Sequence, residues 1–344
     1  MKSMLQHTVC VLSLCTALSV SAPIDASEIN IYSARQPFLI QPILDQFTRN
    51  TGIVTNIVYI KRGLLKRLQR EGQRSSADLV LSSDIGPLTQ MTALGLTRKV
   101  TSPVLSANIP THFRDPQDNW FGLTSRARLI YIARNSELAA RVTSYESLAD
   151  PALKGRICSR AGSHNYSLSL IASMIHARGE RYTQQWLEGL KANLARKPQG
   201  NDRAQVKAIQ EGVCDIALVN SYYYGKMLNN TRKPEQIKWA KAVSLLYPNQ
   251  DSRGTHMNIS GMALLKNAPH AQQAITLMEY LSDVEAQLSY SDKNYEFPVN
   301  PNTPGSDALS IYDKNFKQDN ASLAVITSLR NKAIELVTSI GFDD

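Results

Sequence analysis

Apolar and polar residues alternate along this chain in a pattern that predicts strands and helices in turn. The short apolar runs "EINIYSA", "TNIVYI" and "ADLVLSS" predict buried strands. Between the first two, "PFLIQPILDQFTRNTG" places Phe38, Ile43 and Phe47 on one helical face, which predicts a helix that ends near Gly52. This β-α-β-α-β order is typical of an α/β protein with a doubly wound, mainly parallel sheet.

The same alternation starts again in the second part of the chain, after the long extended segment "FGLTSRARLIYIARN". "RICSRAG", "CDIALVN" and "THMNISGMALLK" predict further strands, and residues 269–294 predict one long helix. Two α/β lobes joined by crossing strands are therefore expected. We assign residues 27–126 with 253–300 to an N-terminal lobe, and 127–252 with 301–344 to a C-terminal lobe.

The first residues follow a different pattern. Lys2 precedes "VCVLSLCTALSV", an apolar run that is too short to span a bilayer, and small residues follow in "SAPIDASEI". This is typical of a secretory signal peptide, with cleavage after Ala22 or Ala26. We assign residues 1–26 to the signal peptide and expect the mature chain in the periplasm.

Composition and charge narrow the class of ligand. The chain has 344 residues, 43% of them hydrophobic, and a formal net charge of +9, which suits anionic ligands. The densest basic stretch, "IKRGLLKRLQREGQR", reads as a solvated helix face, and no zinc-finger, RNA-recognition or helix-turn-helix pattern accompanies it. We therefore expect no nucleic-acid partner.

Four cysteines divide into two groups. Cys10 and Cys15 fall within the expected signal peptide, whereas Cys158 and Cys214 remain in the mature chain. Each of the latter begins a predicted strand. If those strands are neighbours, a disulfide is feasible in an oxidising compartment, and the alternative is two buried thiols.

Export and a two-lobed α/β architecture together indicate a hinged solute-binding protein with its ligand in the cleft between the lobes. In such sheets ligands collect at the carboxyl ends of the strands. The residues that follow the first and third predicted strands, Arg35 and Asp84, are therefore candidate cleft residues.

Three consecutive tyrosines follow one of these strands, in "DIALVNSYYYGKM". Asn220 and Ser221 suit a helix N-cap, so Tyr222 and Tyr223 would open a helix at the carboxyl end of a strand. Tyr224 would then point away and pack. The alternative is an aromatic cluster that only stabilises the lobe.

A fourth tyrosine, Tyr166, occupies the matching place after "RICSR", where Ser163 and Asn165 precede a helix. Phenols have a pKa near 10, so ionising them at neutral pH requires a strong cation. Ferric iron is a hard cation that favours anionic oxygen, and three phenolates balance its charge. Converging tyrosines therefore indicate a ferric site.

The chain resembles the periplasmic ferric-iron-binding proteins of bacterial ABC importers, which are similar in plan to one lobe of transferrin. The resemblance rests on "INIYSARQP", "ADLVLSSDI", "WFGLTSRARLIYIARN", "KGRICSRAGSHNYSLSLIASMI", "LKANLARKPQGNDRAQVKAIQEG", "NSYYYGKM", "GTHMNISGMAL" and "YEFPVNP". It implies the type II binding-protein fold, with Tyr166, Tyr222 and Tyr223 as Fe3+ ligands. It also implies a monomer that takes ferric iron or ferric chelates and delivers the iron to an ABC permease in the inner membrane.

Other members of this family add ligands from the first lobe or bind a synergistic anion such as carbonate. Tyr32 is a candidate fourth ligand, and Gln36 stands where some members have histidine. For the anion, Arg126 and Arg128 alternate on an extended segment, and we expect only one to face the cleft. The resemblance favours Arg126.

Further candidates could hold the anion. Arg35 is the second candidate guanidinium, and its alternative is a surface salt bridge. Backbone donors at the helix starts near Ser163 and Asn220 could add hydrogen bonds.

Two rival functions remain at this stage. A hinged binding protein for an organic ligand such as thiamine, a phosphonate or a polyamine would also use aromatic residues, more often a stacked tryptophan. An enzyme would carry a nucleophile or metal motif, but the chain has no G-x-S-x-G, Walker A or H-E-x-x-H sequence. We therefore expect a binding protein without catalytic activity.

Overall fold

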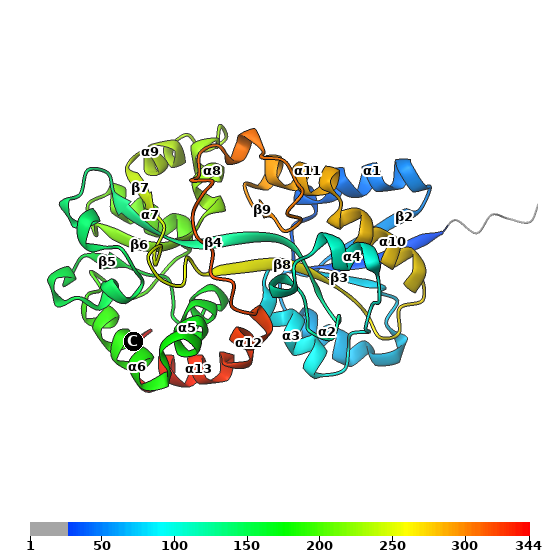
Figure 1. The fold of residues 1–344 in the computed structure, drawn as a ribbon, viewed down its shortest axis with the longest axis horizontal. Helices are drawn as coiled ribbons and strands as arrows, with labels where there is room; N and C mark the ends of the chain where they lie inside the picture. The colour runs from blue at the N-terminus through cyan, green and yellow to red at the C-terminus, as the bar shows by residue number, and fades with distance from the viewer. Residues whose placement is uncertain (1–26) are drawn as a thin grey trace, which may run out of the picture.

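The computed structural model describes residues 27–344, which form two α/β lobes side by side (Figure 1). The signal peptide expected over residues 1–26 lies outside the described residues. Among the residues described, no helix combines the length and apolar character needed to cross a bilayer.

The first lobe is built on three parallel strands. β1 (Glu28–Ser33) lies between β2 (Val54–Tyr59) and β3 (Leu79–Ser82) and pairs in parallel with both. The connecting helices bury apolar faces against this sheet, as Ile43, Leu44 and Phe47 do in the first helix. The helices of this lobe are α1 (Gln41–Thr51), α2 (Leu64–Glu71), α3 (Ile85–Ala93), α4 (Pro103–Asn108), α10 (Ala271–Ser282) and α11 (Val284–Asn294).

Two long strands cross from one lobe to the other. β4 (Phe121–Ala133) pairs in antiparallel fashion with β8 (Met257–Leu264) along its first half and with β6 (Ile216–Asn220) along its second half. Twelve of the 13 residues of β4 are buried, because protein covers both of its faces. β4 therefore belongs to the sheets of both lobes and connects them (Figure 1).

The second lobe also contains parallel strands. β5 (Ile157–Cys158) pairs in parallel with β6, and β7 (Val243–Leu246) pairs with β4. The Sγ atoms of Cys158 and Cys214 are bonded, so a disulfide ties β5 to the residues just before β6. The helices of this lobe are α5 (Asn165–Arg178), α6 (Glu180–Ala192), α7 (Asp202–Gln210), α8 (Tyr222–Leu228) and α9 (Glu235–Lys241).

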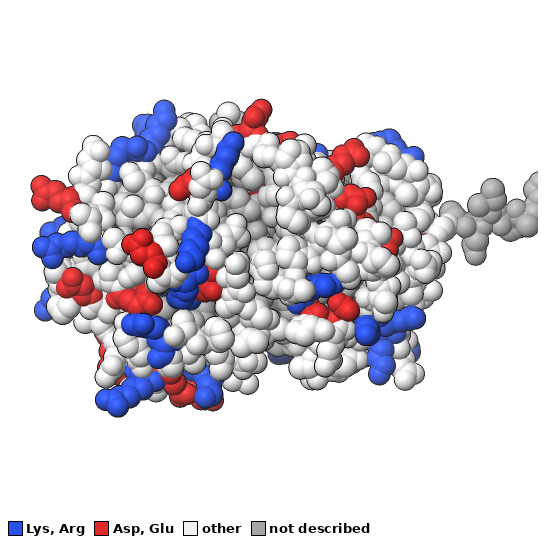
Figure 2. Space-filling model, viewed as in Figure 1, with Lys and Arg blue, Asp and Glu red and all other residues white. Residues whose placement is uncertain are grey.

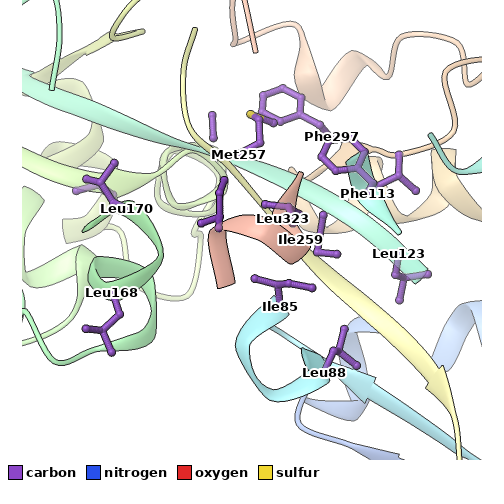
Figure 3. Packing of buried hydrophobic residues seen from close by; sticks show 14 of the residues in the cluster. Ile85, Leu88, Phe113, Leu123, Leu168, Leu170, Met257, Ile259, Phe297 and Leu323 are labelled. Carbon is purple, nitrogen blue, oxygen red and sulfur yellow. The ribbon is translucent and has the colours of Figure 1, made fainter. Parts of the chain in front are cut away.

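The C-terminal segment links the two lobes on one side. The short strand β9 (Phe297–Pro298) pairs with β4, and α12 (Leu323–Ser328) packs against α3 of the first lobe and α5 of the second. Figure 3 shows Leu323 among apolar side chains of both lobes. α13 (Arg330–Ser339) then packs on α5 and α6, so the chain ends on the second lobe.

The two-lobed α/β prediction is confirmed, with β4 and β8 adding antiparallel pairs to the parallel strands. The prediction of one long helix over residues 269–294 is wrong. Asp283 has extended backbone angles and separates α10 from α11, and Asn108 donates to its carboxylate. Apolar residues recur at helical spacing on both sides of Asp283, so the hydrophobic pattern alone did not reveal the break between the two helices.

Charge is distributed over both lobes on the face shown in Figure 2, where Lys and Arg side chains alternate with Asp and Glu. The positive net charge of the chain therefore does not form one continuous basic surface on this face.

Candidate functional site

Three tyrosines from two helix starts meet at the inner edge of the second lobe. Tyr166 is the second residue of α5, after β5, and Tyr222 and Tyr223 open α8 directly after β6. The hydroxyl oxygens of Tyr166 and Tyr222 are 3.2 Å apart, and the ring centroids of Tyr222 and Tyr223 are 4.3 Å apart. The fold thus brings three phenols together from positions 56 residues apart in sequence.

Local hydrogen bonds position these helix starts. The Nδ1 atom of His164 accepts from the backbone N–H of Tyr166 at 3.1 Å and caps α5. Ser221 precedes α8, and its Oγ accepts from the N–H of Ala127 at 3.2 Å, which ties the helix start to β4. Tyr224 turns away from the other two and packs edge-on against Tyr131.

The tyrosines line a cleft between the lobes with a volume of about 670 Å³. The first lobe contributes Arg35, Gln36 and Tyr59 to the lining, among others. The second lobe contributes the three tyrosines, and Arg126 reaches the cleft from the crossing strand β4. Both lobes therefore face whatever occupies the cleft.

Burial holds two of these phenols, those of Tyr222 and Tyr223, in the neutral form. It raises the pKa of Tyr222 well above its ordinary value, and repulsion from the neighbouring phenols of Tyr166 and Tyr223 raises it further. The pKa of Tyr223 is also raised, first by burial and then by the charge of Asp202. Two such phenols ionise at neutral pH only when a strong cation binds their oxygens.

The described residues also contain the other common metal ligands. Within residues 27–344, His, Cys, Asp and Glu form no group of three or more that could hold a metal ion. The donors of the phenol cluster, once ionised, suit a hard cation.

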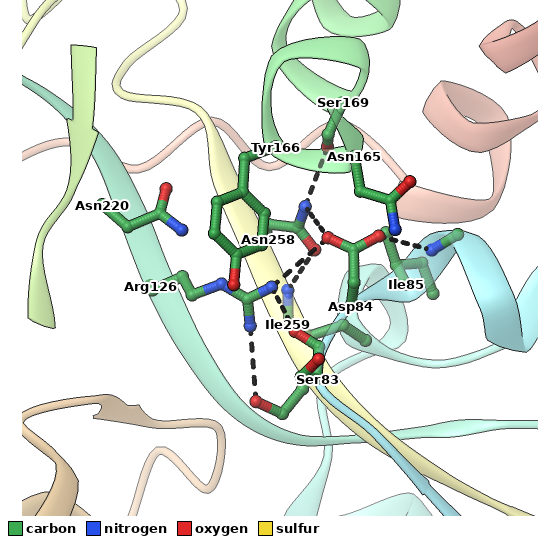
Figure 4. Close-up of polar contacts among 12 residues, drawn as sticks. Ser83, Asp84, Ile85, Arg126, Asn165, Tyr166, Ser169, Asn220, Asn258 and Ile259 are labelled. Atoms are coloured by element: carbon green, nitrogen blue, oxygen red, sulfur yellow. Dashed lines mark hydrogen bonds and ion pairs between the residues drawn. The ribbon is translucent and has the colours of Figure 1, made fainter. Parts of the chain in front are cut away.

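Arg126 lies beside Tyr166 on the cleft wall (Figure 4). Its guanidinium carbon is 5.4 Å from the centroid of the Tyr166 ring, and its Nη2 donates to the backbone oxygen of Ser83 at 2.7 Å. The same nitrogen is 3.4 Å from Oδ2 of Asp84. The first lobe therefore anchors an arginine beside a phenol of the second lobe.

Arg35 is a buried ion-pair partner rather than part of a surface salt bridge. Its Nη2 lies 2.7 Å from Oε2 of Glu296, and its Nη1 also donates to Ser260. Thr124 donates to the same carboxylate oxygen at 2.6 Å. Burial would lower the pKa of Arg35, but the charges of Glu296 and Tyr290 outweigh it, so the arginine remains a cation.

Arg128 corrects one of our arguments from the sequence. Residues two apart on a strand point to the same face, so alternation gave no reason to exclude it beside Arg126. Arg128 instead pairs with Asp202 at 2.8 Å, and Arg160 pairs with the other oxygen of Asp202 at 2.6 Å. Arg126 lines the cleft, as the sequence analysis expected. Arg128 does not line it, because it pairs with Asp202 and not because of its place on the strand.

Tyr32 does not lie in the cleft, so its candidacy as a fourth ligand is not supported. Its ring is buried, its hydroxyl donates to Glu71 at 3.2 Å, and Arg67 donates to that hydroxyl at 2.9 Å. Its position inside β1 directs the side chain toward α2, away from the tyrosine cluster.

Three further predicted residues are not part of the cleft lining. Asp84 caps α3 by accepting from Gly86 and also accepts from Asn258 (Figure 4). The backbone N–H of Ser163 donates to Asp343 at 3.1 Å. Asn220 donates its N–H to Asp202 at 2.9 Å, so this donor faces the lobe interior rather than the cleft.

Three cationic lining residues, Arg203, Lys226 and Lys293, were missed from the sequence. Lys226 lies one turn along α8 from Tyr222, so their helical spacing could have indicated a shared face. Arg203 sits in the first turn of α7, and its guanidinium carbon is 4.9 Å from the Tyr223 ring centroid. Its position depends on how α7 packs, which no local pattern reveals.

Comparison with known proteins identifies the family. Residues 74–320 match the model of the bacterial extracellular solute-binding proteins. The chain is 36% identical over 321 residues to iron uptake protein A1 of Synechocystis, an alignment that covers 93% of this chain and 89% of that protein.

Two solved structures have the same two-lobed fold. Mannheimia haemolytica ferric iron-binding protein A in an open conformation has a TM-score of 0.87 and 44% identity, covering 93% of this chain and all of the other. The Trichodesmium protein IdiA, in complex with iron and citrate ligands, has a TM-score of 0.88 and 38% identity, covering 92% of this chain and 100% of its own. The chain belongs to the family of bacterial extracellular solute-binding proteins.

Proposed function

We propose that this chain is the periplasmic Fe3+-binding component of an ABC importer. It captures ferric iron through the phenolates of Tyr166, Tyr222 and Tyr223. The observation that carries this proposal is the convergence of the three phenols on one cleft. Relatives over nearly the whole chain are named for iron uptake or ferric iron binding.

The chemistry of the cluster suits ferric iron better than other metals. Phenolate is a hard anionic oxygen donor, and softer metals prefer thiolate or imidazole ligands. Three phenolates neutralise the three charges of Fe3+. Positions on the metal that the tyrosines leave open would be filled by a small anion such as carbonate or by water, with Arg126 placed to support an anion.

The proposed role is capture and delivery rather than a reaction. The exported, monomeric protein takes up Fe3+ or a ferric chelate in the cleft, and the loaded form docks on a permease in the inner membrane. Neither bond cleavage nor a resident cofactor is required. The extracellular family and the relatives named for iron uptake support the permease partner and the periplasmic location.

A small organic ligand such as thiamine, a phosphonate or a polyamine is less well supported. Such a ligand would be expected to stack on an indole, but Trp120 and Trp186 are buried away from the cleft lining and Trp239 does not contribute to it either. The phenol cluster then has no clear role. The named relatives also favour iron over this alternative.

The test is iron retention by the purified protein. Protein incubated with ferric nitrilotriacetate is desalted, and bound iron is measured by elemental analysis. We expect about one iron per chain, and Tyr222→Phe should lower the affinity by more than about a hundredfold, because it removes a direct ligand. Tyr224→Phe is the matched control, since that ring packs on Tyr131 outside the cluster. Equal iron content in the two variants, or none in the wild type, would reject the proposal.

A further inference from the structure

The basic stretch that follows β2 is not part of the cleft lining. It contains α2, whose apolar residues Leu64 and Leu68 are buried, and the 3-10 turn after that helix. Lys66 and Arg70 are four residues apart on α2, so they share one face of the helix. The same spacing continues on either side of α2. We call the four exposed cations at this spacing the basic stripe: Arg62, Lys66, Arg70 and Arg74.

The stripe differs from an ordinary solvated helix face. Such a face carries charges of both signs, because opposite charges four residues apart stabilise a helix and like charges destabilise it. Within residues 27–344, no cation of the stripe lies within 4.0 Å of a carboxylate oxygen. The one acidic residue of this stretch, Glu71, accepts from Arg67 and Tyr32 instead. Helix stability therefore does not account for the stripe, and an anionic partner would.

Two exposed valines lie on the α2 side of the first lobe's sheet. Val58 is paired in register with Tyr32, and the hydroxyl of Tyr32 contacts Arg67 and Glu71 of α2. Side chains paired in register on parallel strands point to the same face, so Val58 also points to the α2 side. Val54 shares this face, and each valine is 40% exposed. The surface beside α2 therefore combines unpaired cations with small apolar side chains.

A flat anionic surface suits this combination better than a protein partner does. Protein interfaces have few charged residues at their centre and use aromatic anchors that fill pockets. The stripe consists of long, flexible cations. A cluster of about four to eight Lys and Arg residues on an amphipathic helix is a pattern that binds anionic lipid headgroups. A second copy of this chain would place like charges opposite each other, which is unfavourable.

We propose that the basic stripe is a contact surface for the anionic phospholipid headgroups of a membrane. Because Leu64 and Leu68 are buried in the lobe, α2 rests on the headgroups and does not insert. Tyr59 lines the cleft and lies just before Arg62, so the stripe begins close to the cleft rim. Contact through the stripe would hold that rim near the bilayer that contains the proposed permease. The contact itself does not require iron.

Vesicle binding tests this proposal. Purified exported protein is mixed with vesicles of phosphatidylcholine that contain about 30% phosphatidylglycerol, and bound protein is measured by flotation over a range of lipid concentrations. Vesicles of phosphatidylcholine alone are the lipid control. The stripe variant is Lys66→Gln/Arg70→Gln/Arg74→Gln. The charge-keeping variant is Lys66→Arg/Arg70→Lys/Arg74→Lys.

The matched control variant removes the same charge from the second lobe. It is Arg181→Gln/Lys207→Gln/Lys238→Gln, at exposed positions on α6, α7 and α9. Thermal unfolding checks that every variant is folded. Iron retention, measured separately, should be the same in all of them, so failure of vesicle binding and failure of the proposed function are distinguishable.

We expect the wild type to bind the phosphatidylglycerol vesicles, to bind phosphatidylcholine alone much more weakly, and to dissociate at high salt. The stripe variant should bind about a hundredfold more weakly, since each of the three cations contributes about fivefold. The charge-keeping and second-lobe variants should stay within about threefold of the wild type.

Three results would overturn the proposal. The first is a wild type that does not bind the anionic vesicles, or binds both kinds of vesicle equally. The second is an equal loss in the stripe and second-lobe variants, because net charge and not the stripe would then be responsible. The third is self-association of the wild type that the stripe variant loses, which would assign this surface to a second copy of the chain.

Discussion

At the scale of single residues, the site depends on how costly it is to ionise a buried phenol. Taking one ordinary phenol to phenolate at pH 7 costs about 4 kcal/mol, since its pKa lies about three units higher. Burial and the neighbouring phenols increase this cost at Tyr222 and Tyr223. Without metal the two phenols therefore keep their protons, and only a strongly charged cation displaces them.

Proton release on iron binding follows from this. Because the pKa values of Tyr222 and Tyr223 are raised, both are protonated without metal across neutral pH. Iron uptake should then release at least two protons, and affinity should rise by about tenfold per pH unit for each phenol that ionises. Titration in weakly buffered solution, corrected for the protons taken up by nitrilotriacetate, measures this number. Iron affinity that does not change with pH would show that the phenols are not ligands.

Residue-level prediction from the sequence succeeded where spacing was local. Tyr166 and the Tyr222–Tyr223 pair each follow a strand that could be predicted, so their meeting could be expected. Glu296 could not be found, because it reaches Thr124 across 172 residues through tertiary packing alone. Arg128 was excluded by a wrong use of strand geometry, and its partner Asp202 was not considered.

At the scale of elements, a buried ion cluster joins the strands and helices that present the tyrosines. Asp202 at the start of α7 pairs with Arg128 of β4 and Arg160 after β5, and it accepts from the N–H of Asn220 at the end of β6. Burial would raise the pKa of Asp202, but the two arginines outweigh it and hold the pKa below its usual range. The ion cluster therefore holds together the carboxyl ends of β5 and β6, which precede the helices that carry the tyrosines.

Asp202→Asn should be strongly destabilising, because it leaves two buried guanidinium groups without a counter-charge. We expect the free energy of unfolding to fall by about 3–5 kcal/mol in urea denaturation at neutral pH. The control is Asp215→Asn, whose partner Arg156 is largely exposed, and its cost should stay below about 1 kcal/mol. In the wild type this contribution is present above the ordinary carboxyl pKa and is lost as pH falls through the lowered value. Equal effects of the two substitutions would contradict this account.

The disulfide makes a separate contribution to the same lobe. Cys158 and Cys214 close a loop with a sequence separation of 56, for which chain entropy predicts about 4 kcal/mol of stabilisation. The double variant Cys158→Ala/Cys214→Ala should lose about this much in urea unfolding, and a reductant should have no further effect on it. Wild-type protein whose unfolding is unchanged by the reductant and matches the double variant would show that the bond does not form.

Elements with strong periodicity were predictable, whereas their ends were not. The crossing segment "FGLTSRARLIYIARN" contains β4, which is buried on both faces although Arg126 and Arg128 interrupt its apolar residues. The break at Asp283 escaped detection because α4 contacts it from a distant part of the chain. Likewise, His164 caps α5 although serine and asparagine are the commoner caps.

At the scale of the whole molecule, the proposed ligands are distributed unequally. All three tyrosines belong to the second lobe, whereas the first lobe presents Arg35, Gln36 and Tyr59 across the cleft. The lobes share β4 and β8 and are bridged by α12, so hinge motion would change the distance between these two surfaces. The lobe boundaries themselves remain our proposal from the sequence.

This asymmetry predicts that iron binding depends little on the first lobe. Gln36→Ala should change iron affinity by less than about tenfold, or about 1.4 kcal/mol. Competition with a chelator such as EDTA measures the affinity, with Tyr166→Phe as the comparison that removes a second-lobe ligand. Loss of iron in Gln36→Ala would indicate that the first lobe supplies a ligand and that closure is required.

The most direct test of the central claim is the visible spectrum of the protein during titration with ferric nitrilotriacetate. Tyrosinate bound to Fe3+ should give an intense red-brown charge-transfer band that saturates at one iron per chain and is lost or strongly shifted in Tyr223→Phe. A protein that retains iron but stays colourless would contradict tyrosinate ligation. A protein that stays colourless and retains no iron would direct attention to an organic ligand in the same cleft.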